Sequence, residues 1–92
     1  MFSFLRSATE HLAALGAAVE QADAAEIRMQ AHAIKGSAAN IGAGRIKVLA
    51  ETMETAALLG DLTGMPEWYA AAVSEFDMFK HVTADIVRDQ AP

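Results

Sequence analysis

The chain has 92 residues, of which 53% are hydrophobic and none is cysteine, and its formal net charge is −5. This size predicts a single domain over residues 1–92, and the acidic balance argues against a nucleic-acid binder, which needs clustered Lys and Arg. Without cysteine there is neither a disulfide framework nor a Cys-based metal site, and no stretch reaches the roughly 20 apolar residues of a membrane span. We therefore expect a cytoplasmic protein that does not enter the membrane, with Met1 as its true start.

Two helices are expected in the first half of the chain. Apolar residues recur three or four positions apart from Ser3 to about Glu20, which predicts a helix. Its stripe consists of Phe4, Ala8, Leu12, Leu15 and Val19. A second helix is expected to begin at Asp23, because Asp23 and Glu26 have the spacing of a capping box, in which each side chain bonds a free backbone N–H. The stripe of this helix consists of Ile27, Ala31, Ile34, Ala38 and Ile41.

Two further helices are expected in the second half. Gly42 and Gly44 supply a place for a short turn before the third helix, which is closed by Gly60. Its stripe consists of Ile46, Leu49, Ala50, Met53 and Ala57. Pro66 fits the first turn of a fourth and longest helix that runs towards Gln90. The stripe of this last helix consists of Tyr69, Val73, Phe76, Phe79, Thr83 and Ile86.

No segment alternates apolar and polar residues as a half-buried strand would. Amphipathic helices joined by short connections predict an all-α, antiparallel, up-down-up-down four-helix bundle. We assign Trp68, Phe76 and the five methionines to the core or to packing rather than to a cofactor site. The first helix is complete enough to close the bundle, so we expect a monomer.

His32 has the strongest chemical signal in the sequence. At about 100° per helical residue, it lies most of a half-turn from the apolar stripe, so its imidazole is expected to face solvent or a shallow groove. Gly36, one turn further on, costs a helix about 1 kcal/mol relative to alanine. We attribute this glycine to the space needed beside the ring, which Ala39 also leaves open. Lys35 can reach that same space.

Glu54 is expected to stand level with His32. In an antiparallel hairpin that turns near residue 43, facing positions have numbers that sum to about 86, as 32 and 54 do. A carboxylate there can accept the Nδ1 proton, which fixes the tautomer and leaves the Nε2 lone pair outward as a nucleophile. Taken alone, Glu54 would more often pair with a surface base such as Lys47.

The segment from Ala31 to Ala43, A-H-A-I-K-G-S-A-A-N-I-G-A, resembles the signature of histidine-containing phosphotransfer domains. In that family the histidine is the phosphorylation site, Lys and Gly follow three and four positions later, and a Gln or Glu on the next helix hydrogen-bonds the imidazole. The matching residues in this chain are His32, Lys35, Gly36 and Glu54. The first helix matches only as an amphipathic segment.

The resemblance implies that Nε2 of His32 exchanges a phosphoryl group in line with the phospho-aspartate of a receiver domain, in either direction. The chain would be a stoichiometric phosphocarrier rather than an enzyme, between an upstream hybrid histidine kinase and response-regulator receiver domains. It would bind no cofactor of its own, because the receiver brings the Mg²⁺. Lys35 would partly neutralise the phosphoryl group.

The distribution of basic residues fits an acidic receiver pocket, since four of the seven lie between positions 28 and 47. These four are Arg28, Lys35, Arg45 and Lys47. Our own inference, beyond the family resemblance, is that Arg28 steers the partner or touches the phosphoryl group from the other side. Ala39, Ser37 and Asn40 are secondary candidates for partner contact, although Ser37 and Asn40 equally fit packing or helix termination.

Several other functions are weaker fits to the sequence. His11 and His81 lie on different expected helices and lack the H-x₃-H or E-x-x-H spacing of a metal site. Histidine-kinase hairpins carry an acidic residue directly after their histidine, where this chain has Ala33, and no glycine-rich segment predicts ATP binding. The alternative that stays open is a helical adaptor that binds a receiver or kinase domain without carrying phosphate.

Overall fold

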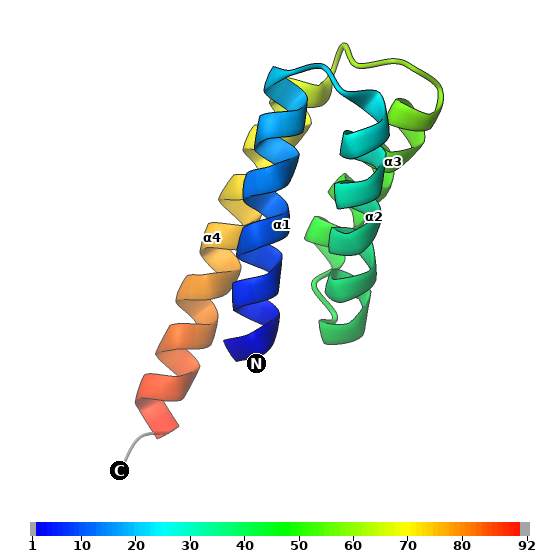
Figure 1. The fold of residues 1–92 in the computed structure, drawn as a ribbon. Helices are drawn as coiled ribbons and strands as arrows, with labels where there is room; N and C mark the ends of the chain where they lie inside the picture. Colours follow the sequence, from blue (N-terminus) through cyan, green and yellow to red (C-terminus); the bar gives the residue numbers. More distant parts are fainter. Residues whose placement is uncertain (1, 91–92) are drawn as a thin grey trace.

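The computed structural model describes the backbone of residues 2–90 and the side chains of residues 6–81. This part of the chain forms the helices α1 (Phe2–Glu20), α2 (Ala24–Ile41), α3 (Gly44–Leu58) and α4 (Met65–Gln90). They run alternately up and down (Figure 1). Helix α2 packs against α1 and α3, and α4 also packs against α1 and α3. The expected all-α four-helix bundle is confirmed, and α4 is the longest helix.

The start of α2 contains half of the expected capping box. Asp23 Oδ1 accepts a hydrogen bond from the Glu26 backbone N–H at 3.2 Å. The reciprocal bond is absent, because the Asp23 N–H instead donates to the Ala18 carbonyl at 3.0 Å. The Glu26 carboxylate is turned to Gln30, from whose Nε2 it accepts a bond at 2.8 Å. The cap therefore fixes where α2 begins and leaves Glu26 bonded along its own helix.

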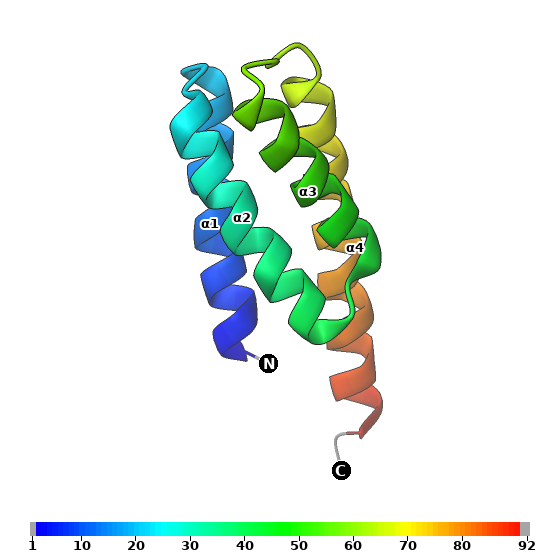
Figure 2. The same ribbon diagram turned by 90° about the vertical axis from the view of Figure 1, so that its right-hand side faces the viewer.

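The turn between α2 and α3 sets the register of the hairpin. Gly42 ends α2 with φ at 75°, a left-handed conformation that costs glycine little because it has no Cβ. The Ala43 N–H closes the turn by donating to the Ala38 carbonyl at 2.9 Å. Gly44 is already the first residue of α3. Figure 2 shows the result, with α2 and α3 side by side and joined at their lower ends.

The core consists of the inward stripes of the helices. Its largest fully buried side chains are Leu15, Ile27, Met53 and Met65. The stripe expected for α4 is wrong at Val73, which is exposed, whereas its neighbour Ala72 is buried. The reason is the rotation of α4: Ala72 and Phe76, one turn apart, line the same small interior space as residues of the other helices.

The assignment of the methionines to the core is correct for Met53 and Met65 and wrong for Met29 and Met78, which are at least half exposed. Met29 follows the buried Ile27 by two positions, which on a helix places it about 200° away, on the opposite face. Trp68, Tyr69 and Phe79 pack partly buried against the core, as expected. The expected core positions Phe4, Thr83 and Ile86, and Met1, lie outside the described side chains.

A close contact joins α1 to α4. The Tyr69 hydroxyl donates a hydrogen bond to the Leu12 carbonyl at 3.1 Å. The tyrosine ring lies directly over Gly16, where an added Cβ would collide with the hydroxyl oxygen. Glycine at this position therefore lets the two helices approach. No helix in the described part of the chain is long and apolar enough to span a bilayer.

Candidate functional site

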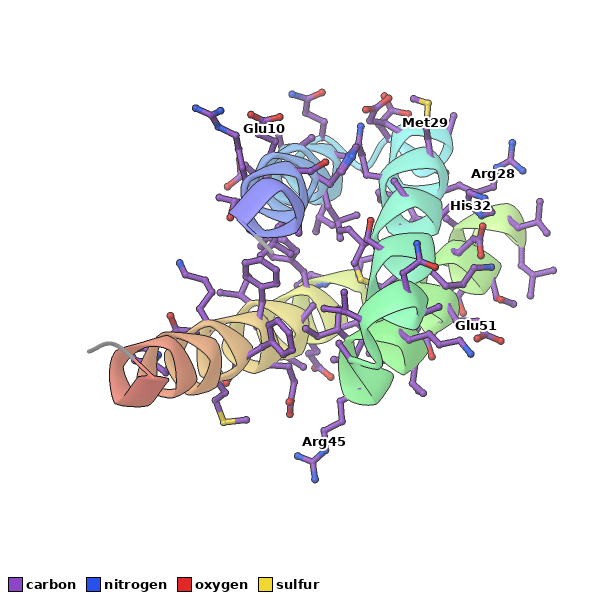
Figure 3. The ribbon with its side chains drawn as sticks, turned by 90° about the horizontal axis from the view of Figure 1, so that it is seen from below. Glu10, Arg28, Met29, His32, Arg45 and Glu51 are labelled. Atoms are coloured by element: carbon purple, nitrogen blue, oxygen red, sulfur yellow. The ribbon has the colours of Figure 1, made fainter. Side chains whose placement is uncertain are left out.

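His32 lies in the middle of α2, on the face turned away from the core. Its neighbours Ala31 and Ile34 belong to the inward stripe of α2 and are buried. The His32 side chain, by contrast, is 70% exposed. In Figure 3, which looks along the bundle, His32 projects from α2 on the side of α3. The expected exposure of the imidazole is confirmed.

Glu54 of α3 reaches this imidazole. Its Oε2 lies 2.6 Å from Nδ1 of His32, and its side chain is only 19% exposed. The register expected from the short turn is therefore confirmed. Because an ionised carboxylate can only accept hydrogen bonds, Nδ1 is the protonated nitrogen when the imidazole is neutral. The lone pair then belongs to Nε2, which diverges from Glu54 towards solvent.

The second oxygen of the same carboxylate holds Lys35. The distance from Lys35 Nζ to Glu54 Oε1 is 2.6 Å. The sequence predicts that Lys35 can reach the space beside the ring; in the structure its ammonium bonds the carboxylate that also holds Nδ1 of His32. The spacing of residues in the sequence did not predict this contact, because a carboxylate at the height of Glu54 can bond either Lys35 or His32. One carboxylate thus links the lysine and the histidine of α2.

This pairing shifts the acidities of both partners. The hydrogen bond from Lys35 lowers the pKa of Glu54 most strongly, the bond from His32 adds to this, and partial burial opposes both. The same hydrogen bond from Glu54 raises the pKa of Lys35 above its ordinary value. Glu54 is therefore a carboxylate at neutral pH, the state in which it can hold the Nδ1 proton.

Gly36 leaves open space one turn beyond His32. A Cβ built at Gly36 would meet no atom within 4 Å, and its φ is not positive. Neither packing nor backbone conformation therefore demands glycine there. Ala39 and Asn40, further along α2, are also exposed, and Ser37 is half-buried. The small residues beside His32 keep this side of α2 accessible to a large group.

A groove with a volume of about 590 Å³ begins at His32 and extends along the first turns of α2. Its other lining residues are Asp23, Ala25, Glu26, Arg28, Met29 and Glu54. Arg28 and His32 project from the same side of α2 in Figure 3, and Met29 from another. Sequence reasoning identified Arg28 but missed Met29, whose position opposite the buried stripe was the available signal.

The other two histidines do not line the groove at His32 and have partners of their own. Nδ1 of His11 is 2.7 Å from Oε1 of Gln30, and Nδ1 of His81 is 2.8 Å from the Asp77 carbonyl. Among the described residues, no group of three or more His, Cys, Asp or Glu side chains is arranged to hold a metal ion.

Comparison with known families gives one result. A family model described as "Hpt domain" matches residues 2–86, a span that covers α1, α2 and α3, most of α4 and the whole site. Neither the curated proteins nor the solved structures yielded a match to the chain.

Proposed function

This chain belongs to the Hpt domain family, and from that membership we propose that it carries a phosphoryl group on Nε2 of His32. Hpt domains act in histidine phosphotransfer within phosphorelays, where they interact with receiver domains and kinases. The observation that supports His32 as the acceptor is its bond to Glu54: Nδ1 is 2.6 Å from the carboxylate while the side chain stays 70% exposed. That arrangement directs a lone pair outward from an accessible ring.

The proposed reaction is an in-line exchange with a receiver phospho-aspartate. The Nε2 lone pair forms a bond to phosphorus while the P–O bond to the aspartate breaks, and its electron pair leaves with the aspartate carboxylate. The imidazole keeps its Nδ1 proton, and the ionised Glu54 balances the positive charge that the ring gains. Mg²⁺ and basic groups of the receiver neutralise the equatorial phosphoryl oxygens. The reverse steps pass the group to a second receiver.

Within this reaction Lys35 acts on His32 through Glu54. By keeping the carboxylate ionised and fixed, it keeps the acceptor tautomer in place. Gly36 provides the clearance that the partner needs, with Ala39, Ser37 and Asn40 as secondary contacts. These roles are part of the proposal and are supported by the distances and exposures described above.

The proposed partners are an upstream hybrid histidine kinase and response-regulator receivers in the cytoplasm. The chain would act there as a monomeric carrier without kinase activity, and would rely on the receiver for Mg²⁺. Two basic side chains, Arg28 and Lys35, flank the histidine in a chain of net charge −5. Of these two, Arg28 lines the groove and has no ion-pair partner among the described side chains, and such a basic group favours docking of an acidic receiver pocket.

A transfer assay tests the proposal. The chain is incubated with a panel of phosphorylated receivers and Mg²⁺ and then analysed for acid-labile, base-stable label. We expect label on the wild type and on His11→Gln and His81→Gln, but none on His32→Gln, which should still bind receivers. Binding without label across the panel would favour the adaptor function instead. Label on His32→Gln would move the site to another histidine.

A further inference from the structure

The two cations that flank His32 differ in what they already bind. Lys35 is held by Glu54 at 2.6 Å. Arg28 lines the groove beside His32 and, among the described side chains, takes part in no hydrogen bond or ion pair. Its guanidinium is therefore available to a ligand in the groove.

A phosphoryl group on His32 would lie on the side of this available cation. Nδ1 faces Glu54, so a group bonded to Nε2 is directed away from the Lys35–Glu54 pair. On a helix, residues four positions apart have Cβ atoms about 5–6 Å apart, which an arginine side chain easily bridges. Arg28 precedes His32 by four positions and projects from the same side of α2 (Figure 3).

The groove also creates a need for positive charge. Its lining includes two acidic residues: Asp23, which caps α2, and Glu26, which bonds Gln30. Because both carboxylates are negatively charged, they repel a phosphoryl group. Lys35 does not line this groove, and its charge is already offset by the Glu54 carboxylate that it bonds. Arg28 can offset the repulsion without breaking any contact.

We propose that the guanidinium of Arg28 binds the phosphoryl group on Nε2 of His32, a role that rests on the proposed function. The planar fork of arginine matches two phosphoryl oxygens and remains charged at all relevant pH values. Arg28 forms no covalent bond in the reaction. It holds the phosphoryl group from the α2 side while the receiver approaches from solvent, and Lys35 keeps the acceptor tautomer through Glu54.

Labelling with phosphoramidate tests this role without a receiver. Nε2 bonds to phosphorus, the P–N bond of phosphoramidate breaks, and ammonia leaves. The phosphohistidine is then titrated by ³¹P NMR in the wild type, Arg28→Gln, Arg28→Lys, Lys35→Met and Arg45→Gln. Arg45→Gln is the control, because it removes the same charge from a side chain that is 80% exposed, lies 3.4 Å from Glu75 and does not line the groove.

We expect Arg28→Gln to raise the pH at the midpoint of the phosphoryl ionisation. The size of the shift should correspond to about threefold weaker binding of the fully ionised phosphoryl group, as for an exposed charge pair. Arg28→Lys should restore part of the loss, and Arg45→Gln should match the wild type. The proposal is wrong if Lys35→Met moves the midpoint and Arg28→Gln does not. It is also wrong if Arg28→Gln slows transfer from receivers but leaves the midpoint unchanged, since Arg28 would then act in docking.

The labelling of the wild type distinguishes a failure of the Arg28 role from a failure of the proposed function. If the wild type takes up label on His32 and only the Arg28 result fails, the relay function stands and the arginine role falls. If the wild type accepts no label from phosphoramidate or from any receiver, the relay function fails, and the role of Arg28 fails with it.

Discussion

Under the proposed function, Glu54 is the residue that fixes the tautomer of His32. Each of its two oxygens has one partner, the histidine ring and the lysine ammonium, and both partners come from α2. Removing this carboxylate would release the imidazole to exchange freely between its two neutral tautomers. It would also leave Lys35 without the partner that holds it.

We expect Glu54→Ala to slow phosphoryl acceptance by about 10- to 100-fold, the usual effect of losing a carboxylate that orients a working histidine. Glu54→Gln should lose less, because an amide oxygen can still accept a hydrogen bond from the Nδ1–H of His32. Transfer assays measure the rate of phosphoryl acceptance, and ¹⁵N NMR of the imidazole measures the tautomer. Glu51→Ala, one turn away on α3 and exposed, is the control. Unchanged rate and tautomer in Glu54→Ala would contradict the assignment.

The Lys35–Glu54 pair predicts a pH-dependent stability. The pKa of Glu54 is lowered below its ordinary value of 4.5, so its contribution is present above 4.5 and is lost as the pH falls through the lower, folded-state pKa. The pKa of Lys35 is raised above 10.5, so its contribution is present below 10.5 and is lost as the pH rises through the higher, folded-state pKa.

Urea unfolding of the wild type and Lys35→Met at a series of pH values measures this dependence. The difference in unfolding free energy should be constant between these two limits and should shrink as the pH falls below 4.5. Lys47→Met, at an exposed lysine on α3, should show no such acid-dependent difference. A difference that survives in strong acid would mean that Lys35 stabilises the fold through packing rather than through charge.

At the scale of the element, α2 carries a residue that weakens it. Gly36 is exposed, has ordinary backbone angles and has open space above it, so alanine would fit without strain. We expect Gly36→Ala to raise the unfolding free energy by about 0.5–1 kcal/mol, because alanine has the higher helix propensity. Gly36→Gln should fold as well as the wild type but block transfer from receivers. Wild-type transfer by Gly36→Gln would refute the need for clearance.

The helices and the hairpin register were predictable from the sequence because they depend on local patterns. Apolar spacing gave α1 to within about a residue of its observed start, and the short turn after α2 placed Glu54 opposite His32. Side-chain choices that depend on tertiary packing were not predictable. Lys35 selects Glu54 rather than open solvent, and α4 is rotated so that Ala72 rather than Val73 is buried.

At the scale of the molecule, the bundle depends on a close approach of α1 and α4. Gly16 lies under Tyr69, whose hydroxyl bonds the Leu12 carbonyl. Alanine at Gly16 must therefore displace the tyrosine ring. The same substitution that stabilises α2 at Gly36 should destabilise the protein at Gly16, because one Cβ enters open space and the other enters a packed contact.

We expect Gly16→Ala to lower the unfolding free energy by about 1–3 kcal/mol, the usual cost of overpacking. Tyr69→Phe removes the atom nearest to the new Cβ, so the double variant should lose less than the sum of the two single variants. Chemical denaturation of the four proteins gives the coupling. Additive losses would show that Tyr69 does not limit the approach of the two helices.

The openness of His32 also has a consequence in time. Under the proposed function, a phosphoryl group on an imidazole that is 70% exposed is accessible to water as well as to a receiver. We therefore expect the lifetime of the phosphohistidine to depend on the rate of hydrolysis relative to the rate of transfer to the next receiver. A change in the receiver concentration would then lengthen or shorten the lifetime of the phosphorylated state without any change in this chain.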